Sequence, residues 1–491
     1  MANVGGIIKS IQTIMRKDAG IDGDAQRIGQ LVWMFFLKIL DDKIAENELL
    51  GSDYQSPLPS DLRWSSWAQD EEGLTGEKLA DFINLELFPR LKNLAVEGPH
   101  RDRSLLVRDA FEDAYNYMKN GTLIRQVINK INEIDFNNAG DKHAFGDVYE
   151  QILKDLQSAG NAGEFYTPRA VTQFTVDMLD PKLDEVVLDP ACGTGGFLAH
   201  VIDHKSDHYV QSVADVQTLQ RSILGVEKKA LPHLLCMTNM MLHGIEAPTN
   251  IFHDNTLSVP LKDHKWRGMI DVIVTNPPFG GTEEDGIEKN VPLKYQTRET
   301  ADLFLVLIIE LLKKGGRAAV VLPDGTLFGE GTKTRIKEKL MDECNLHTIV
   351  RLPNGVFSPY TGIKTNILFF EKGQPTRETW FYEHSYPDGY KSYSKTKPMR
   401  IEEFDVEKRW WGELATREGR RAGPDAWTVS IEEIKSRGYN LDIQNPNTAA
   451  SVHKNPRSVA DELERNRAQV ERLQMLLKSV FSDALGLENG E

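Results

Sequence analysis

Apolar residues recur at helical spacing through the first 140 positions of the chain. Between Ile7 and Met15 they return every three or four residues, which places them on one face of a helix. Further helical patterns cover Asp24–Leu50, Phe82–Leu94 and Asp109–Met118. We therefore expect an all-helical amino-terminal domain over residues 1–140, closed by turn-forming residues at 137–140.

The pattern changes after residue 141, where short apolar runs alternate with helical stretches such as Asp302–Lys314, which Gly315 and Gly316 follow. The runs are VVLDPA, SILGVE, NIFHDNTL, DVIVTNPPF, RAAVVLPDG, LHTIVRLPN and NILFFEKG. This alternation predicts an α/β domain with a doubly wound, mostly parallel sheet. We assign it to residues 141–400 and expect ligands at the carboxyl ends of its strands.

Two further segments follow this domain. Residues 401–454 have a mixed pattern and form an extension, and residues 455–491 form a helical tail. On one side of the tail, residues recur at alternating spacings of four and three positions. The run covers about three heptads, which is the shortest length that indicates a coiled coil. Its members are Val459, Leu463, Asn466, Val470, Leu473, Leu477 and Val480.

Composition narrows the classes of protein to which the chain can belong. Among 491 residues there are three widely spaced cysteines, which fits neither a disulfide framework nor a zinc site and favours reduced thiols in the cytoplasm. The most apolar stretch, Leu31–Leu40, is too short to span a membrane. The net charge of −15 predicts weak binding to DNA unless basic residues cluster locally or a partner supplies phosphate contacts.

A glycine-rich turn follows the first predicted strand of the α/β domain. In VVLDPACGTGGF, Asp189 ends the strand, and Gly193, Gly195 and Gly196 come after it. Their spacing is not the G-x-G-x-x-G of dinucleotide-binding proteins. A turn of this kind lets the backbone approach a ligand closely, and an acid beside it suits a cationic, amino-bearing ligand better than a pyrophosphate.

Two more acids follow the next two strands. Glu227 ends SILGVE, where an acid binds the hydroxyls of a ribose, and Asp254 follows in IFHDNTL, where an adenine amino group would lie. Three acids at three successive strand ends fit an adenosyl ligand without phosphates, and S-adenosylmethionine is the candidate. Each acid alone fits a helix cap or a turn residue as well.

The fourth strand ends in Asn276-Pro277-Pro278-Phe279. Proline cannot donate to a sheet ladder, so the strand stops there. The side-chain carbonyl of Asn276 and the backbone carbonyl of Pro277 match the two hydrogens of an exocyclic amine, and Phe279 offers a face for a planar base. The motif predicts a clamp for an aromatic amine opposite a methyl donor. A Pro-Pro turn with a core phenylalanine is the plain alternative.

Three motifs together resemble a known family. GEFYTPR (Gly163–Arg169), DPACGTGGF and NPPFGG occur in the order seen in adenine-N6 DNA methyltransferases of the gamma class. The chain is most similar to the modification subunit of type I restriction–modification systems, over most of its length. The resemblance implies a class I S-adenosylmethionine-dependent core that methylates an adenine flipped out of double-stranded DNA. Such a transfer needs neither a metal nor a covalent intermediate.

The resemblance also implies roles for individual residues. The GEFYTPR segment would close over the cofactor, the glycine turn would hold its methionine part, and the acids would hold its ribose and adenine. The residues implied in cofactor binding are Glu164, Phe165, Tyr166, Thr167, Pro168, Arg169, Asp189, Cys192, Gly193, Thr194, Gly195, Gly196, Glu227 and Asp254. Those implied in gripping the target adenine are Asn276, Pro277, Pro278 and Phe279. We interpret the Cys192 thiol as a packing group, because an amine acceptor requires no thiol nucleophile.

Partners follow from the same resemblance. A separate specificity subunit would choose the DNA site and bind two modification subunits, and a restriction subunit would complete the nuclease. The repeating side of the tail would dock on the specificity subunit or pack on its own chain. Gly280–Thr300 is either a mobile loop over the active site or a solvated insertion, and the basic stretch Lys391–Arg400 is either a phosphate contact or a solvated loop.

Two alternatives belong to other functional classes. A methyltransferase acting on protein glutamine or ribosomal RNA can share an Asn-Pro-Pro-aromatic strand end, and a scaffold can retain the fold without catalysis. The GEFYTPR motif and the large helical domain disfavour the first alternative. The intact Asn276, Phe279 and glycines disfavour the second.

Overall fold

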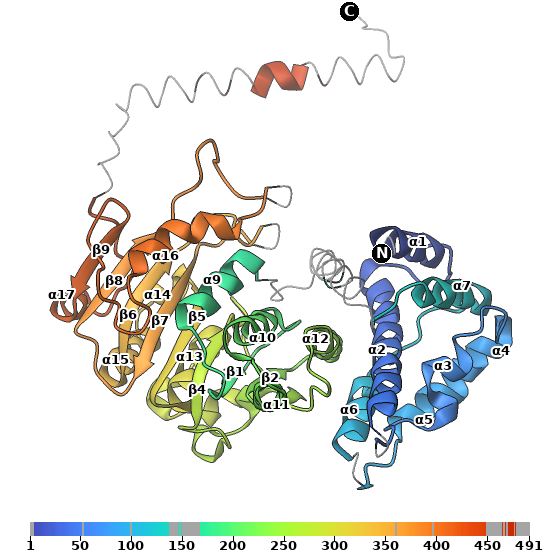
Figure 1. The fold of residues 1–491 in the computed structure, drawn as a ribbon. Coiled ribbons are helices and arrows are strands. Elements are labelled where there is room, and N and C mark those ends of the chain that lie inside the picture. Colours follow the sequence, from blue (N-terminus) through green and yellow to red (C-terminus); the bar gives the residue numbers. More distant parts are fainter. Residues whose placement is uncertain are drawn as a thin grey trace, which may run out of the picture.

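A helical amino-terminal domain and an α/β domain lie side by side in the computed structural model (Figure 1). The structure describes residues 4–51, 54–98, 101–136, 146, 149, 167–358, 361–394, 397–447, 464, 467, 470–475 and 477. Within these ranges no helix is long and apolar enough to cross a lipid bilayer.

The amino-terminal domain is built around the long helix α2 (Asp24–Leu50). Its other helices are α1 (Val4–Met15), η1 (Ser60–Leu62), α3 (Trp64–Trp67), α4 (Gly76–Asp81), η2 (Phe82–Leu87), α5 (Phe88–Lys92), α6 (Arg101–Glu112) and α7 (Gly121–Asn132). The first two predicted helices are confirmed as α1 and α2. The pattern predicted over Phe82–Leu94 corresponds to η2, which is a π-helical turn, and α5.

The helix predicted over Asp109–Met118 is confirmed only as far as Glu112, where α6 ends, and the chain then runs without helix to α7. The backbone N–H groups of residues 117 and 118 donate to the side-chain oxygen of Gln30 at 2.7 and 3.2 Å. Those of residues 119 and 120 donate to the carboxylate of Asp18 at 3.0 and 2.9 Å. Two buried polar side chains thus take the place of helical hydrogen bonds.

A nine-stranded sheet forms the centre of the α/β domain, in the order β3-β2-β1-β4-β5-β7-β6-β8-β9. The strands are β1 (Val187–Asp189), β2 (Ile223–Glu227), β3 (Ile251–His253), β4 (Ile270–Thr275), β5 (Leu312–Pro323), β6 (Cys344–Arg351), β7 (Thr365–Lys372), β8 (Glu378–Glu383) and β9 (Ala426–Ser430). β7 is antiparallel to β5 and β6, β9 is antiparallel to β8, and the other neighbours are parallel. The doubly wound, mostly parallel sheet is confirmed, and β9 adds an edge strand from within 401–454.

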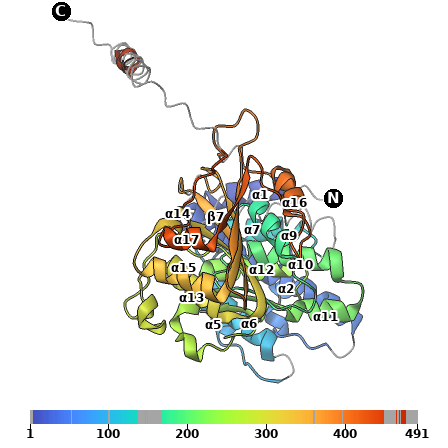
Figure 2. The same ribbon diagram turned by 90° about the vertical axis from the view of Figure 1, so that its left-hand side faces the viewer.

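Helices cover both faces of this sheet (Figure 2). Val272 and Val274 of β4 pack with one set of helices and Ile273 with the other, as the alternation of side chains along a strand requires. The first set comprises α9 (Arg169–Leu179), α10 (Gly196–Tyr209), α11 (Val213–Arg221), α12 (Ala230–Leu242) and α16 (Asp405–Trp411). The second comprises α13 (Thr300–Leu311), α14 (Asp324–Phe328), α15 (Thr332–Glu343) and α17 (Ile431–Ser436). Single turns of 3-10 helix are η4 (Thr256–Ser258), η5 (Leu261–Asp263), η6 (Ile287–Asn290), η7 (Leu293–Tyr295) and η8 (Ile401–Phe404).

The helix predicted over Asp302–Lys314 ends earlier than expected. α13 stops at Leu311, and residues 313–316 already belong to β5. They bulge out between two pairings with β4, and Gly315 accommodates the bulge with a φ of 80°. The two glycines therefore shape the start of a strand and do not cap the helix.

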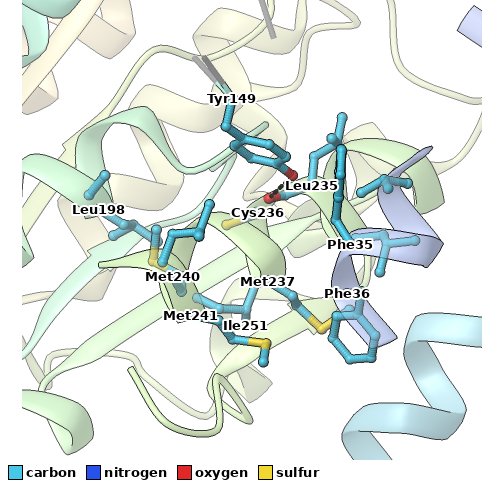
Figure 3. Close-up of a cluster of buried hydrophobic side chains, with 14 of the residues drawn as sticks. Phe35, Phe36, Tyr149, Leu198, Leu235, Cys236, Met237, Met240, Met241 and Ile251 are labelled. Atoms are coloured by element: carbon cyan, nitrogen blue, oxygen red, sulfur yellow. Dashed lines mark hydrogen bonds between the residues drawn. The ribbon is translucent and has the colours of Figure 1, made fainter. Parts of the chain in front are cut away.

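The two domains meet where α2 packs on α12. Figure 3 shows Phe35 and Phe36 beside Met237 in a cluster of buried apolar side chains from both domains. The Tyr149 hydroxyl donates to the backbone carbonyl of Leu235 on α12 at 3.1 Å. The cluster makes the domain contact a continuation of the core.

Phe36→Ala should lower the midpoint of thermal unfolding, because removing a fully buried phenylalanine costs about 3–5 kcal/mol. Leu85→Ala is the control, since Leu85 is 70% exposed and its loss should change stability by less than about 0.5 kcal/mol. Calorimetry of both variants checks this. Equal midpoints for the two variants would contradict the contribution of the α2–α12 contact.

Candidate active site

The carboxyl ends of four neighbouring strands surround one cavity of about 410 Å³. β1 lies between β2 and β4 in parallel register, so the segments that follow these strands emerge at the same edge. The lining residues are Pro190, Ala191, Gly193, Val226, Glu227, Lys228, Lys229, Pro232, Asp254, Asn255, Thr256, Asn276, Pro277, Pro278, Gly281, Thr282, Glu283, Glu284, Thr300 and Phe304. The volume falls within the range of small-molecule sites, about 300–1,000 Å³.

The glycine turn rests directly on α12. Gly195 has a φ of 82°, and a Cβ atom there would meet Cys236 Sγ at 2.8 Å and Met240 Cε at 2.9 Å. Figure 3 places these two side chains in the buried cluster that reaches the amino-terminal domain. Asn239 of α12 also donates from Nδ2 to the carbonyl of Thr194 at 3.1 Å. Only glycine allows the turn to approach α12 this closely.

Cys192 is a packing residue of this turn. Its Sγ lies 3.7 Å from Cys236 Sγ, and both thiols are buried. The contact with Cys236 and burial together raise the pKa of the Cys192 thiol. A thiol in such a place is a poor nucleophile, which agrees with its interpretation as a packing group.

Glu227 joins the end of β2 to the glycine turn. Its Oε2 accepts from the Gly193 N–H at 3.0 Å and its Oε1 accepts from the Lys229 N–H at 2.7 Å. Burial raises the pKa of Glu227. Asp254 lies exposed beside it, and its backbone N–H donates to the Glu227 carbonyl at 3.1 Å. Both acids line the cavity, as the sequence predicts for strand ends that share one edge.

Asp189 lies behind the cavity wall, since it is only 1% exposed and its neighbours Pro190 and Ala191 form the lining. Its Oδ1 accepts from the Ala191 N–H at 3.1 Å. Burial, with a smaller contribution from the charge of Glu227, raises the pKa of Asp189 to about 7. The two carboxyl groups are thus close enough to interact.

Asn276 presents its carboxamide at the end of β4. Its Nδ2 donates to Thr167 Oγ1 at 2.9 Å. Its Oδ1 is buried and has no hydrogen-bond partner among the described residues. Leaving such an acceptor unpaired costs about 1–3 kcal/mol. Asn276 Oδ1 is therefore an acceptor that remains available to a ligand. Asn276 lines the cavity together with Pro277 and Pro278.

The remaining predicted residues lie around this site or outside the described part of the chain. Phe279 is 4% exposed and packs edge-on against Phe357, with ring centroids 5.9 Å apart, so its ring does not line the cavity. Pro168 precedes α9, and Arg169 is its first residue. Residues 164–166 lie outside the described residues.

The segment over Gly280–Thr300 is anchored on the α/β domain. Its η6 turn packs on η4 and its η7 turn on α15, and Asn290 Nδ2 donates to the carbonyl of Leu257 at 2.8 Å. Thr300 Oγ1 donates to the Gly281 carbonyl at 3.1 Å. Residues 281–284 form one wall of the cavity. The sequence offered a loop over the active site as one of two alternatives for this segment, but it did not single out residues 281–284 as lining residues.

Lys228 and Thr256 were also missed. Lys228 donates from Nζ to Glu284 at 2.8 Å and so connects the end of β2 to the 281–284 wall. Thr256 Oγ1 donates to the Pro190 carbonyl at 2.6 Å and connects the segment after β3 to the segment after β1. Their positions next to predicted acids were the signal available in the sequence.

The fold and the row of strand ends define a class I methyltransferase core with an amide, not an acid, at its fourth strand. Comparison with known proteins makes this specific. The family N-6 DNA Methylase matches residues 140–455, and the HsdM N-terminal domain matches residues 5–131. The chain therefore belongs to the N-6 DNA methylase family, among the modification subunits of type I restriction–modification systems.

Individual relatives agree with this assignment. The type I restriction enzyme EcoEI methylase subunit of Escherichia coli is 61% identical over 489 residues, which cover 99% of each chain. A crystal structure of a modification subunit of a putative type I restriction enzyme from Vibrio vulnificus YJ016 has a TM-score of 0.81 at 44% identity and covers 91% of this chain and 97% of that one. A chain from work on complex assembly and conformational transition of the type I R-M system has a TM-score of 0.81 at 35% identity and covers 99% of both.

The predicted family and enzyme class are thereby confirmed: the chain is an adenine-specific DNA methyltransferase. The comparisons do not support the alternative of a methyltransferase acting on protein glutamine or ribosomal RNA.

Asp189→Asn should remove part of the pH dependence of stability. The folded pKa of about 7 lies above the ordinary value of 3.8, so between these values the folded state holds a proton that the unfolded state has released. The free energy of unfolding contributed by this group is complete below about pH 4 and is lost as pH rises through 7, by at most about 4 kcal/mol. Urea unfolding of both proteins from about pH 5.5 to about pH 8.5 measures it. A wild-type minus variant difference that does not fall with pH would contradict the assignment.

Proposed function

We propose that this chain transfers a methyl group from S-adenosylmethionine to N6 of an adenine flipped out of double-stranded DNA, at sites chosen by a separate specificity subunit. The buried Oδ1 of Asn276, which has no partner among the described residues, carries the proposal. Asn276 directly follows β4, whereas acids end or directly follow the three neighbouring strands β1, β2 and β3. An acceptor that lacks a partner is suited to a ligand that brings an N–H donor.

The charge and shape of the cavity fit S-adenosylmethionine. Glu227 and Asp254 line it, Asp189 lies behind it, and the positive-φ glycines bring backbone to its wall. Carboxyl groups suit the ammonium, ribose hydroxyls and adenine amine of this cofactor. Of the two lysines in the lining, Lys228 is engaged by Glu284. When bound, the cofactor supplies an electrophilic methyl group on a sulfonium.

We assign cofactor roles by position. The turn over Cys192, Gly193, Thr194, Gly195 and Gly196, with Asp189, holds the methionine part. Glu227 holds the ribose, Asp254 contacts the adenine of the cofactor, and residues 164–169 close over it. The hydrogen bond from Gly193 to Glu227 supports a common site for the turn and the ribose acid.

Asn276 and Pro277 act on the target base. The adenine N6 amine is conjugated and therefore weakly nucleophilic. Hydrogen bonds from this amine to Asn276 Oδ1 and the Pro277 carbonyl favour a pyramidal nitrogen with an exposed lone pair, and positioning then supplies most of the acceleration. Pro278 keeps the strand end rigid. Stacking of Phe279 on the base requires its ring to turn from Phe357 toward the cavity.

The partner chains follow from charge and family. With a net charge of −15, the chain lacks the basic excess that gives strong binding to DNA. A specificity subunit that binds two modification subunits would supply site choice and phosphate contacts, and a restriction subunit would complete the nuclease. The full-length similarity to a chain from work on type I complex assembly supports this proposal.

The tail is the proposed docking element for the specificity subunit. Of its repeating positions, Val470, Leu473 and Leu477 are 53%, 57% and 62% exposed. Val459, Leu463, Asn466 and Val480 lie outside the described residues. A helix that exposes apolar side chains at this spacing is suited to pairing with helices of a partner.

Asn276→Ala should abolish methylation of DNA by the complex while binding of S-adenosylmethionine survives, because the variant loses an acceptor for the amine and leaves the acids intact. Transfer of labelled methyl groups to DNA and calorimetric titration with the cofactor measure the two properties. Asn93→Ala is the matched control, since Asn93 is an exposed amide that bonds within the amino-terminal domain. Near-normal methylation by Asn276→Ala would refute the role of this residue.

Replacing both Leu473 and Leu477 by aspartate should abolish co-purification with the specificity subunit, because charges would enter an apolar contact. Met475→Asp is the control. Met475 is 71% exposed and its position falls outside the four-three repeat. Affinity purification of co-expressed subunits measures the effect, with cofactor binding as the check on folding. Loss of the partner in both variants, or in neither, would exclude docking through this side of the tail.

A further inference from the structure

The hydroxyl of Thr167 is a hydrogen-bond partner of the Asn276 carboxamide. The two residues are 109 positions apart, and a hydrogen bond of 2.9 Å joins Asn276 Nδ2 to Thr167 Oγ1. A carboxamide has a donor end and an acceptor end, which exchange places on a half-turn about its last side-chain bond. In this structure the Thr167 hydroxyl accepts from the donor end, which leaves the acceptor end for the cavity.

The geometry points to Thr167 as a positioning residue for methyl transfer. By accepting from Nδ2, the threonine hydroxyl leaves Oδ1 as the end available to the adenine amine. Among the described residues Oδ1 has no other partner, although it is buried. With the donor end toward the cavity, the side chain would oppose the N–H groups of the amine with N–H groups of its own. This inference rests on the proposed role of Asn276.

The backbone at both ends of this hydrogen bond is restrained. Asn276 is followed by two prolines, whose rings fix φ. Thr167 precedes Pro168, which leads into α9, and Val171 N–H closes the first turn of that helix by donating to the Pro168 carbonyl at 2.9 Å. Neither residue can easily follow the other if the hydrogen bond is lost. The orientation of the Asn276 amide therefore depends on the Thr167 hydroxyl. The backbone at the end of β4 does not set it alone.

Thr167→Val tests the inference in the complex with the specificity subunit, because valine keeps the shape of threonine and removes the hydroxyl. We expect kcat for DNA methylation to fall about tenfold to hundredfold, a larger change than in the KM for DNA or in the Kd for S-adenosylmethionine, which residues 164–169 help to hold. Thr167→Ser retains the hydroxyl and should restore kcat to within about threefold. Thr175→Val is the control, since this threonine of α9 donates to the Val171 carbonyl within its own helix.

Each contrary result has a distinct meaning. An unchanged kcat in Thr167→Val would overturn the inference, and so would a weaker Kd for the cofactor at unchanged kcat, which would assign the hydroxyl to cofactor binding. Equal losses in the serine and valine variants would show that the hydroxyl alone does not restore kcat, and would overturn the inference. If Asn276→Ala remains active, the proposed function of that residue fails irrespective of Thr167. If Asn276→Ala is inactive and Thr167→Val is normal, only the positioning role fails.

Discussion

The parallel pairing of β1 with β4 is the constraint on which the site depends. It sets Val187 opposite Val272 and Leu188 opposite Ile273, so that the glycine turn and Asn276 emerge side by side. Both faces of these strands are buried, and alternate residues pack into different apolar clusters. A slip of one residue would exchange the two sets of side chains, so the core itself fixes the register. The relative position of the glycine turn and the Asn276 carboxamide is thus a property of the sheet.

Contacts with α12 and with Glu227 hold the glycine turn on two sides. Behind it, α12 leaves no room for a Cβ at Gly195, and the same helix packs on α2 of the amino-terminal domain. In front, the Glu227 carboxylate accepts from the Gly193 N–H. The amino-terminal domain therefore supports the site through an uninterrupted apolar contact, which explains why a helical domain of this size accompanies the sheet.

Most of the sheet could be predicted from the sequence because its strands are buried on both faces and appear as short apolar runs. The last two strands escaped notice, since ETWFYE and AWTVS mix polar residues with large aromatic ones near the sheet edge. The segment over residues 113–120 was misjudged because its backbone bonds to Gln30 and Asp18, which lie far away in sequence. The Thr167–Asn276 contact had no local signal for the same reason: the fold brings the two residues together.

Electrostatics explain why acids gather at this edge. Burial raises the pKa of both Asp189 and Glu227, and the charge of Glu227 adds to the effect on Asp189. Two carboxyl groups in such an environment resist ionisation together. The nearby Lys228 does not relieve them, because its ammonium is engaged by Glu284. A cationic ligand would favour the ionised carboxylates, whereas a phosphate would increase the repulsion. The arrangement therefore favours, by charge, a cationic ligand over one that carries phosphate groups.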